Sequence, residues 1–163
     1  MDESSFWQMI DRTRVASGDD SDQHIELLVD ELAKLSEADI IGFDTIFHFH
    51  MGRAYNRNLW AACQVFDSCA DDSFSDFCGW LIAQGKDVYE RALADPDSLV
   101  DVVDLDTDAT PESFSYVSMT AYEKRTGGKE MPLTPHLGRR VGLTGDDWEE
   151  AKKKVPRLRD KFK

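Results

Sequence analysis

Two histidines and an aspartate lie within seven residues of one another, in a stretch whose apolar residues have helical spacing: Asp44, His48 and His50. Side chains two apart on an α-helix point about 160° away from each other, so His48 and His50 cannot chelate one metal ion from a helix. Asp44 and His48 are four apart and share a flank. That spacing suits a histidine oriented by a carboxylate for acid–base chemistry or metal binding, and it equally suits a surface ion pair.

Adjacent carboxylates at Asp71 and Asp72 form a second candidate. A carboxylate pair can carry out acid–base work or bind a divalent metal. Helix chemistry offers another explanation, because an N-cap aspartate accepts backbone N–H groups and a further acidic residue is stabilised at the positive end of the helix. No nucleophile elbow, zinc-protease motif or phosphate-binding loop accompanies the pair. The catalytic residues are therefore left unassigned.

The segment Asp104–Asp108 begins like a calcium-binding loop. Its sixth position is Ala109 and its twelfth is Ser115, where such a loop needs a glycine and a bidentate glutamate. Neither position has the residue that a calcium-binding loop requires. We therefore predict no metal site and no cofactor.

Cys63, Cys69 and Cys78 are an odd number of cysteines, spaced by six and nine residues. Zinc sites use closer pairs, and a disulfide framework uses an even number. Each cysteine falls in a helical apolar pattern, which predicts reduced, buried core thiols. The N-terminus is acidic, unlike a signal peptide, so we expect a cytoplasmic protein.

The segment Asp71–Gly85 has one apolar helical stripe and a second, unusual flank. The stripe residues recur at the spacing of a helix with one buried face: Phe74, Phe77, Cys78, Leu81 and Ile82. Ser73, Asp76, Trp80 and Gln84 lie together on a flank turned about 110° from that stripe. A tryptophan among small polar groups predicts a recognition surface; the alternative is a tryptophan packed against another helix with its indole N–H satisfied.

A second helix, expected at about 112–125, repeats this two-faced pattern. Tyr116, Met119 and Glu123 gather opposite an apolar stripe. We predict a ligand or partner groove between the two helices, unless a many-helix bundle buries both faces. The predicted binding residues are Asp72, Asp76, Trp80, Gln84, Tyr116 and Glu123.

Helices dominate the expected fold, and no stretch is a convincing strand. At 163 residues, the chain predicts one all-α domain over 1–163, a bundle of seven to eight helices. Ser21 or Asp22 is expected to cap the second helix and Ser36 the third. The Asp-rich segment 95–108 is expected to be an exposed loop. The expected helices span about 3–15, 37–55, 57–68, 71–84, 86–94, 110–125 and 146–154, together with a second helix whose stripe is Ile25, Leu28, Val29 and Leu32. Pro156 is expected to break or kink the last helix.

Net charge is −13, and it is unevenly distributed. Residues 139–163, a basic connector and helix, hold nine basic and five acidic side chains, whereas the rest is strongly acidic. An acidic body repels phosphate backbones, so nucleic-acid binding is not expected. The basic tail is expected to dock on the acidic body, or else to touch an anionic partner. No apolar run approaches the roughly 18 residues of a membrane span, so no membrane partner is expected.

Several motifs together resemble the bacterial DUF4240 family, whose name records the lack of an assigned function. They are Asp71-Asp-Ser-Phe with Gly79-Trp-Leu-Ile-Ala-Gln-Gly85, Phe6-Trp7-x-x-Ile10-Asp11, Leu59-Trp60-x-Ala62, Asp95-Pro-Asp-Ser-Leu99, Tyr116-Val117 with Ala121-Tyr122-Glu123, Met131-Pro132 and Val155-Pro-Arg-Leu158. Cys78 stands where the family usually has arginine, and Ala70 where it usually has serine. The resemblance covers most of the chain and implies no activity.

Two function classes follow. We expect a non-catalytic helical adaptor module that binds a protein or peptide. The alternative is a small metal-assisted or acid–base enzyme, or its accessory protein, using Asp71/Asp72 or Asp44/His48. The absence of a complete catalytic constellation favours the first class. Whether a reaction is catalysed, the partner's identity and the oligomeric state are not predicted.

Overall fold

The computed structural model describes all residues except 19, 68, 110 and 134–141, and it does not describe the side chains of Asp71 and Asp72. Within these described residues every regular element is a helix, which confirms the all-α prediction. The elements are α1 Glu3–Ser17, α2 Ser21–Ala33, α3 Glu37–Ala54, α4 Arg57–Phe66, α5 Asp71–Ala83, α6 Lys86–Ala94, 3-10 helices Pro96–Asp101 (η1) and Glu112–Tyr116 (η2), α7 Val117–Thr126, α8 Trp148–Lys153 and α9 Pro156–Lys161.

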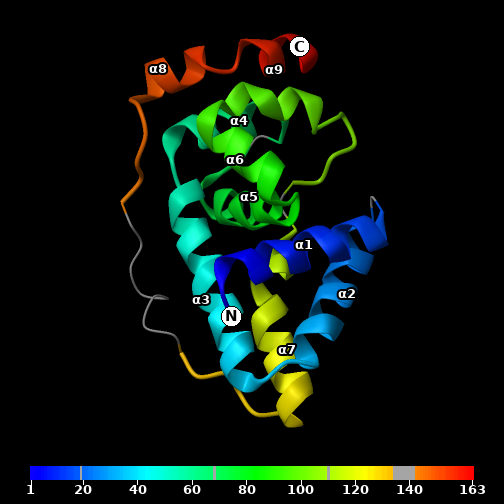
Figure 1. Ribbon diagram of the computed structural model, residues 1–163. Coiled ribbons are helices and arrows are strands. Elements are labelled where there is room, and N and C mark those ends of the chain that lie inside the picture. Colours follow the sequence, from blue (N-terminus) through cyan, green and yellow to red (C-terminus); the bar gives the residue numbers. More distant parts are fainter. Residues whose placement is uncertain (19, 68, 110, 134–141) are drawn as a thin grey trace.

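The helices form two groups that share α3 and are joined by α1 (Figure 1). In one group α2 and α3 both pack against α7. In the other α4, α5 and α6 gather around the far end of α3 (Figure 1). Helix α1 contacts α2, α3 and α5 and so ties the groups together. Buried aromatic rings such as Phe6, Phe43, Phe74 and Phe77 form a continuous core between them.

Side-chain caps explain where several helices begin. Ser36 accepts a hydrogen bond from the Asp39 N–H at 3.1 Å, as predicted for the start of α3. Helix α2 is capped by Asp20, so the prediction of Ser21 or Asp22 at that position was wrong. The prediction of an aspartate cap on α5 was also wrong. That helix has Ala70 at its N-cap, and Ser73 Oγ accepts from the Ala70 N–H at 3.0 Å.

Gly85 lies between α5 and α6 with a φ of +90°, a conformation that side chains other than glycine rarely adopt. A Cβ atom there would collide with the carboxylate of Asp11 on α1. The missing side chain therefore lets α1 cross closely over the α5–α6 junction. This crossing brings Arg14 of α1 beside the end of α5, which matters for the site below.

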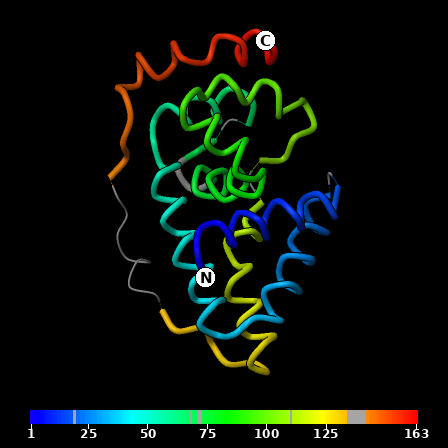
Figure 2. The backbone as a smooth tube through the Cα atoms, viewed as in Figure 1, coloured from blue at the N-terminus to red at the C-terminus, as the bar shows by residue number. Residues whose placement is uncertain are grey.

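The basic tail docks on the acidic body, as predicted, and runs along the outside of α4 and η1 (Figure 2). Asp97 accepts hydrogen bonds from the backbone N–H groups of Arg157 and Leu158, both at 3.0 Å. The Arg157 guanidinium lies 2.8 Å from Asp101. Asp97 thus supplies acceptors to the first turn of α9, whose N–H groups have no partner within the helix.

Three further predictions need correction. Cys63 and Cys69 form a disulfide across the α4–α5 connection, so only Cys78 is a free thiol among the three. All three are buried, as predicted. The segment expected to be one helix over 112–125 begins as η2 and becomes α-helical only at Val117. The expected loop 95–108 contains η1.

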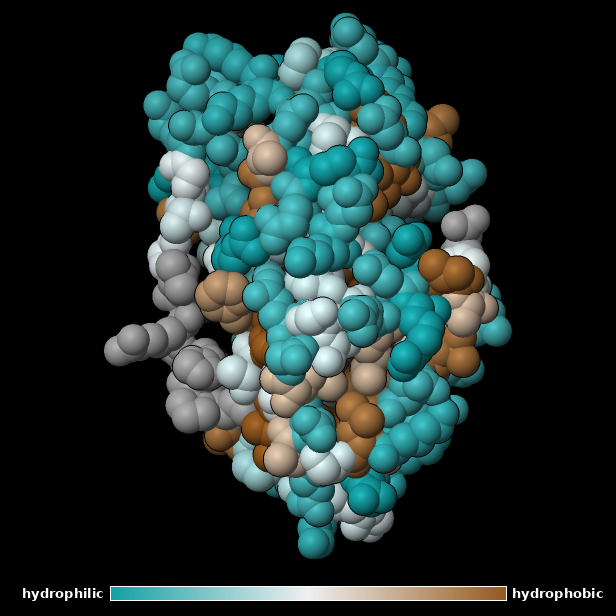
Figure 3. Space-filling view, in the orientation of Figure 1, coloured by the Kyte–Doolittle hydropathy of each residue, from teal (hydrophilic) through white to brown (hydrophobic). Residues whose placement is uncertain are grey.

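The surface is mainly hydrophilic. On the face in Figure 3, apolar residues form small separate groups among charged and polar ones. Within the described residues, no helix combines the length and apolar character needed to cross a membrane. A candidate site must therefore be sought among polar hollows.

Candidate functional site

A polar cleft of about 450 Å³ lies where three segments distant in sequence meet. Its walls come from the end of α1, the start of α2, the end of α5 and the loop that follows η1. We call it the acidic cleft because four aspartates line it: Asp20, Asp104, Asp106 and Asp108. The other lining residues used below are Arg14, Ser21, His24, Trp80 and Gln84.

Two of the aspartates, Asp20 and Asp104, are held by hydrogen bonds from nearby residues. Asp20 caps α2 and accepts from the Gln23 N–H at 2.9 Å. Asp104 accepts from the Asp106 N–H at 3.1 Å and from the Thr107 hydroxyl at 3.0 Å, which folds the loop into a turn. In the described part of the chain, no lysine or arginine forms an ion pair with Asp20, Asp104 or Asp106.

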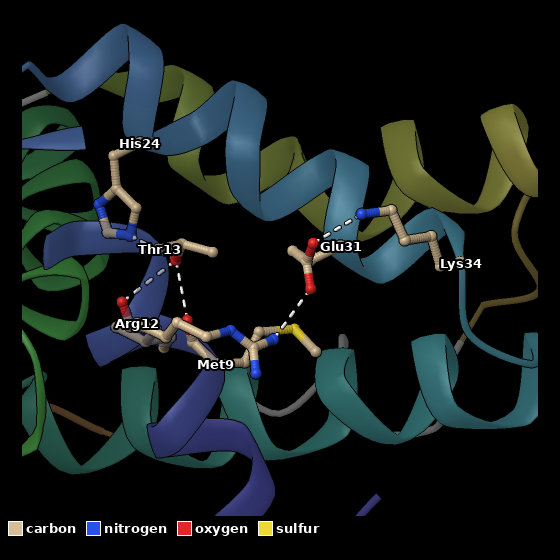
Figure 4. Close-up of polar contacts among 7 residues, drawn as sticks. Met9, Arg12, Thr13, His24, Glu31 and Lys34 are labelled. Carbon is tan, nitrogen blue, oxygen red and sulfur yellow. Dashed lines mark hydrogen bonds and ion pairs between the residues drawn. The ribbon is translucent and has the colours of Figure 1, made fainter. Parts of the chain in front are cut away.

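His24 of α2 is held against α1 by Thr13 (Figure 4). Its Nε2 lies 3.0 Å from the Thr13 hydroxyl oxygen. That hydroxyl has one proton, and it lies 2.8 Å from the Met9 carbonyl and 3.1 Å from the Ile10 carbonyl. Because the hydroxyl proton goes to these carbonyls, Nε2 carries a hydrogen and donates to Thr13. The other ring nitrogen, Nδ1, is then an acceptor that points away from Thr13 (Figure 4).

The His24 imidazole is only 5% exposed. Burial lowers its pKa to about 4; the Ile10 carbonyl works in the opposite direction, and the positive charge of Arg14 lowers it further. The ring is therefore neutral at pH 7. Because His24 also lines the acidic cleft, the small part of the ring left open meets that space. The cleft thus contains a neutral histidine with an acceptor nitrogen.

Trp80 and Gln84 are the two predicted binding residues that the structure brings to the cleft. Gln84 donates from Nε2 to the Trp80 carbonyl at 3.3 Å. Trp80 is only 5% exposed and packs on Phe77, with ring centroids 5.7 Å apart. Packing therefore accounts for most of the Trp80 surface, and the indole forms a wall of the cleft rather than an open platform.

The other predicted binding residues lie elsewhere. Tyr116 is 47% exposed, and its hydroxyl donates to Glu112 at 2.8 Å; this bond raises the pKa of Tyr116, with a smaller contribution from the charge of Asp76. Asp76 and Tyr116 are therefore neighbours, as expected from the packing of α5 on η2. Glu123 is exposed on α7, which packs mainly on α2 and α3. The side chain of Asp72 lies outside the described residues.

The Asp44–His48 pair forms as its spacing predicted. His48 Nδ1 lies 2.9 Å from the Asp44 carbonyl oxygen and 3.4 Å from its carboxylate. Burial works to lower the pKa of His48, but the bonds to Asp44 outweigh it and raise the value. Asp44 and His48 do not line the acidic cleft. The side chains of the other predicted pair, Asp71 and Asp72, are not described.

His50 contacts a different set of residues. It is fully buried in an aromatic cage formed by Phe6, Trp7, Phe49 and Tyr89, with its Nε2 3.3 Å from Glu3 Oε1. In the described ranges, no group of three or more histidine, cysteine, aspartate or glutamate side chains is arranged to hold a metal ion.

The sequence interpretation missed His24 altogether. One signal was available, because His24 precedes Leu28 by four residues and so continues the buried stripe of α2. A polar residue at such a position needs a partner inside the protein. The partner, Thr13, is similarly placed on the buried face of α1.

A comparison with known protein families gives one match. A family model described as a protein of unknown function, DUF4240, matches residues 1–124. Neither the curated proteins nor the solved structures contain a match to this chain. The matched range includes every residue of the acidic cleft and leaves out α8 and α9.

Proposed function

The chain belongs to the DUF4240 family, and we propose that it is a non-catalytic helical binding module that engages a protein or peptide segment at the acidic cleft. The observation that carries this proposal is the cleft itself. It joins Trp80 and Gln84, two residues whose pattern predicted recognition, to a buried histidine and a carboxylate-rich loop. We propose that one helical domain over residues 1–163 presents this surface.

Two properties of the cleft support the proposal. Its volume of about 450 Å³ falls within the roughly 300–1,000 Å³ typical of ligand sites. Its polar groups come from α1, α2, α5 and a loop held by the Asp104 turn, so they are fixed before a ligand arrives. Groups already in place lose less conformational entropy on binding.

The enzyme alternative has weaker support. Asp44 and His48 form a pair in which the carboxylate raises the pKa of the imidazole, as an acid–base site requires. Asp44 is only 2% exposed and the His48 side chain 25%, so the pair is mostly buried and the interpretation as a surface ion pair was wrong. A substrate needs access to the reacting groups, so a buried structural ion pair accounts for these residues more simply.

Selection of random-sequence peptides displayed on phage against the purified full-length chain tests the proposal. The blocking variant is Ser21→Trp, because Ser21 is exposed and lines the cleft in the first turn of α2. The matched control is Ser4→Trp, an exposed serine in the first turn of α1 that does not line it. Circular dichroism establishes that both variants are folded.

We expect the selected peptides to bind the wild-type chain and Ser4→Trp equally. Ser21→Trp is expected to bind them about tenfold more weakly, because the indole fills the cleft. Failure to select any peptide, or unchanged binding by Ser21→Trp, would contradict the proposal.

A further inference from the structure

We propose that the group entering the acidic cleft is the cationic side chain of a lysine or arginine in a basic peptide segment. This inference rests on the proposed function and names the chemistry that the cleft selects. Three features carry it: the charge of the lining, the orientation of His24 and the position of Arg14.

The charge of the lining favours a cation. Four aspartates face one arginine, and in the described residues no counter-ion pairs with Asp20, Asp104 or Asp106. Low-dielectric walls concentrate the field of such a group, and the net charge of −13 attracts basic segments from a distance. A carboxylate or phosphate ligand would be repelled by the same field.

His24 provides a second, independent indication. The ring is more than nine-tenths buried, and its described partners, the Thr13 hydroxyl at Nε2 and the Ile10 carbonyl, both belong to α1. Nδ1 is therefore an acceptor without a donor, on a ring that lines the cleft. An ammonium or guanidinium group supplies an N–H for this nitrogen. An anionic ligand would place an acceptor against an acceptor.

Arg14 indicates a peptide rather than a simple cation. It lines the cleft yet forms none of the described ion pairs, and its Nε is buried without a hydrogen-bond partner. Its position beside Gly85 places it at the edge where α1 meets the end of α5. A peptide carbonyl next to the inserted side chain offers an acceptor for the guanidinium, which a bare metal ion or ammonium lacks.

A second cleft has the opposite character. It measures about 310 Å³, lies between α2 and α7, and is lined by Asp30, Ala33, Lys34, Lys124 and Arg125. Lys124 already pairs with Asp30 at 2.7 Å. Its three cationic side chains repel a basic peptide, so this second cleft does not compete with the acidic cleft for such a ligand.

Fluorescence anisotropy with defined labelled peptides tests the inference. Three peptides share one glycine–serine backbone and carry arginine and lysine, glutamine, or glutamate at the same positions; a library-selected peptide is the fourth probe. The cleft variant is Asp20→Asn/Asp106→Asn, because asparagine also caps helices and Asp106 uses only its backbone N–H in the loop turn. The control, Glu26→Gln/Glu130→Gln, removes the same charge from exposed residues outside the cleft.

We expect the basic peptide to bind about tenfold more tightly than the glutamine peptide, with affinity falling as salt rises. The cleft variant should weaken binding about fivefold or more, and the control less than about twofold. The inference would be overturned if the glutamine peptide bound as tightly as the basic peptide, or if the cleft variant bound the basic peptide as tightly as the wild-type chain. The binding-module proposal would still hold if the library-selected peptide bound. Failure of all four peptides would overturn both.

Discussion

Two buried histidines occupy contrasting environments in this protein. His24 lies against Thr13 and opens onto the acidic cleft, whereas His50 is sealed inside the aromatic cage. Burial lowers the pKa of both rings. His24 donates from Nε2 to Thr13, and its ring also lines the cleft. Neither ring nitrogen of His50 forms a hydrogen bond, and its nearest charged group is Glu3.

The comparison shows that burial and a shifted pKa do not identify a binding group by themselves. His50 shares both properties with His24, yet no ligand can reach it without displacing aromatic rings. What distinguishes His24 is an open nitrogen at a polar hollow. A candidate site is therefore better identified by where a polar atom meets free space than by the pKa shift alone.

The largest expected effect is the loss of stability when a tryptophan beside either histidine is truncated. These tryptophans are Trp7 in the aromatic cage and Trp80 in the acidic cleft. Both are nearly buried, at 2% and 5% exposure. We expect Trp7→Ala and Trp80→Ala each to lower the free energy of unfolding by about 3–5 kcal/mol, because both lose core packing. Urea denaturation measures this. A loss below about 1 kcal/mol for Trp80→Ala would mean that Trp80 is an open recognition platform after all.

The next effect is the pH dependence that His24 confers. The folded pKa of about 4 lies below the ordinary value of 6.5, so the unfolded chain binds the proton more tightly. The stabilisation is complete above pH 6.5 and is lost as the pH falls toward about 4. We expect a loss of up to about 3 kcal/mol across this window.

Urea denaturation of the wild-type chain and His24→Gln across that pH range measures the effect as a difference in slope. Carboxylates titrate in both proteins and cancel in the comparison. Parallel curves would show that the histidine is not held neutral at the edge of the cleft.

A smaller effect separates the hydrogen-bonded ring from the caged one. Thr13→Val keeps the volume but leaves the Nε2–H of His24 buried without an acceptor, and we expect it to cost about 1–3 kcal/mol. His50→Leu removes nitrogens that form no hydrogen bond, so its cost should stay within about 1 kcal/mol. Chemical denaturation at pH 7 measures both. The reverse order would contradict the assignment of His24 as the partnered ring.

The smallest effect is on the ionisation of His50. Burial lowers its pKa, and the nearby Glu3 carboxylate partly opposes this. Glu3→Gln should therefore lower the pKa of His50 further and leave His24 unchanged. NMR titration of the two imidazole rings measures both values. A rise in the pKa of His50 would show that the Glu3 contact does not persist in solution.

Helix positions and the buried stripes were largely predictable from the sequence, because both depend on local periodicity. Ser36 caps α3 and Gly127 ends α7 in a left-handed conformation, as local chemistry dictates. The cap of α5 was mispredicted because the helix has Ala70 at its N-cap, where Ser73 at the third helical position accepts from the Ala70 N–H. A cap of this kind has no periodic signature.

The site was less predictable because its parts come together only in three dimensions. Trp80 and Gln84 were found from one helix face, but the spacing of one helix cannot reveal that Arg14 and the loop at Asp104 lie opposite. The Cys63–Cys69 bond was missed for the same reason, since only the reversal of the chain after α4 brings the two Cα atoms to 5.6 Å. Tyr116 and Glu123 were expected on one helical face, yet Tyr116 ends η2, Glu123 belongs to α7, and neither lines the cleft.

The contact between Asp97 and α9 has a consequence for the order of assembly. A ribosome delivers Arg157 and Leu158 60 and 61 residues after Asp97, when the helices around Asp97 have already emerged. Until then the Asp97 carboxylate remains hydrated, and η1 lacks its cover. Docking of α9 is therefore a late step of assembly, and chains interrupted before Arg157 leave an uncovered surface that proteases and chaperones can recognise.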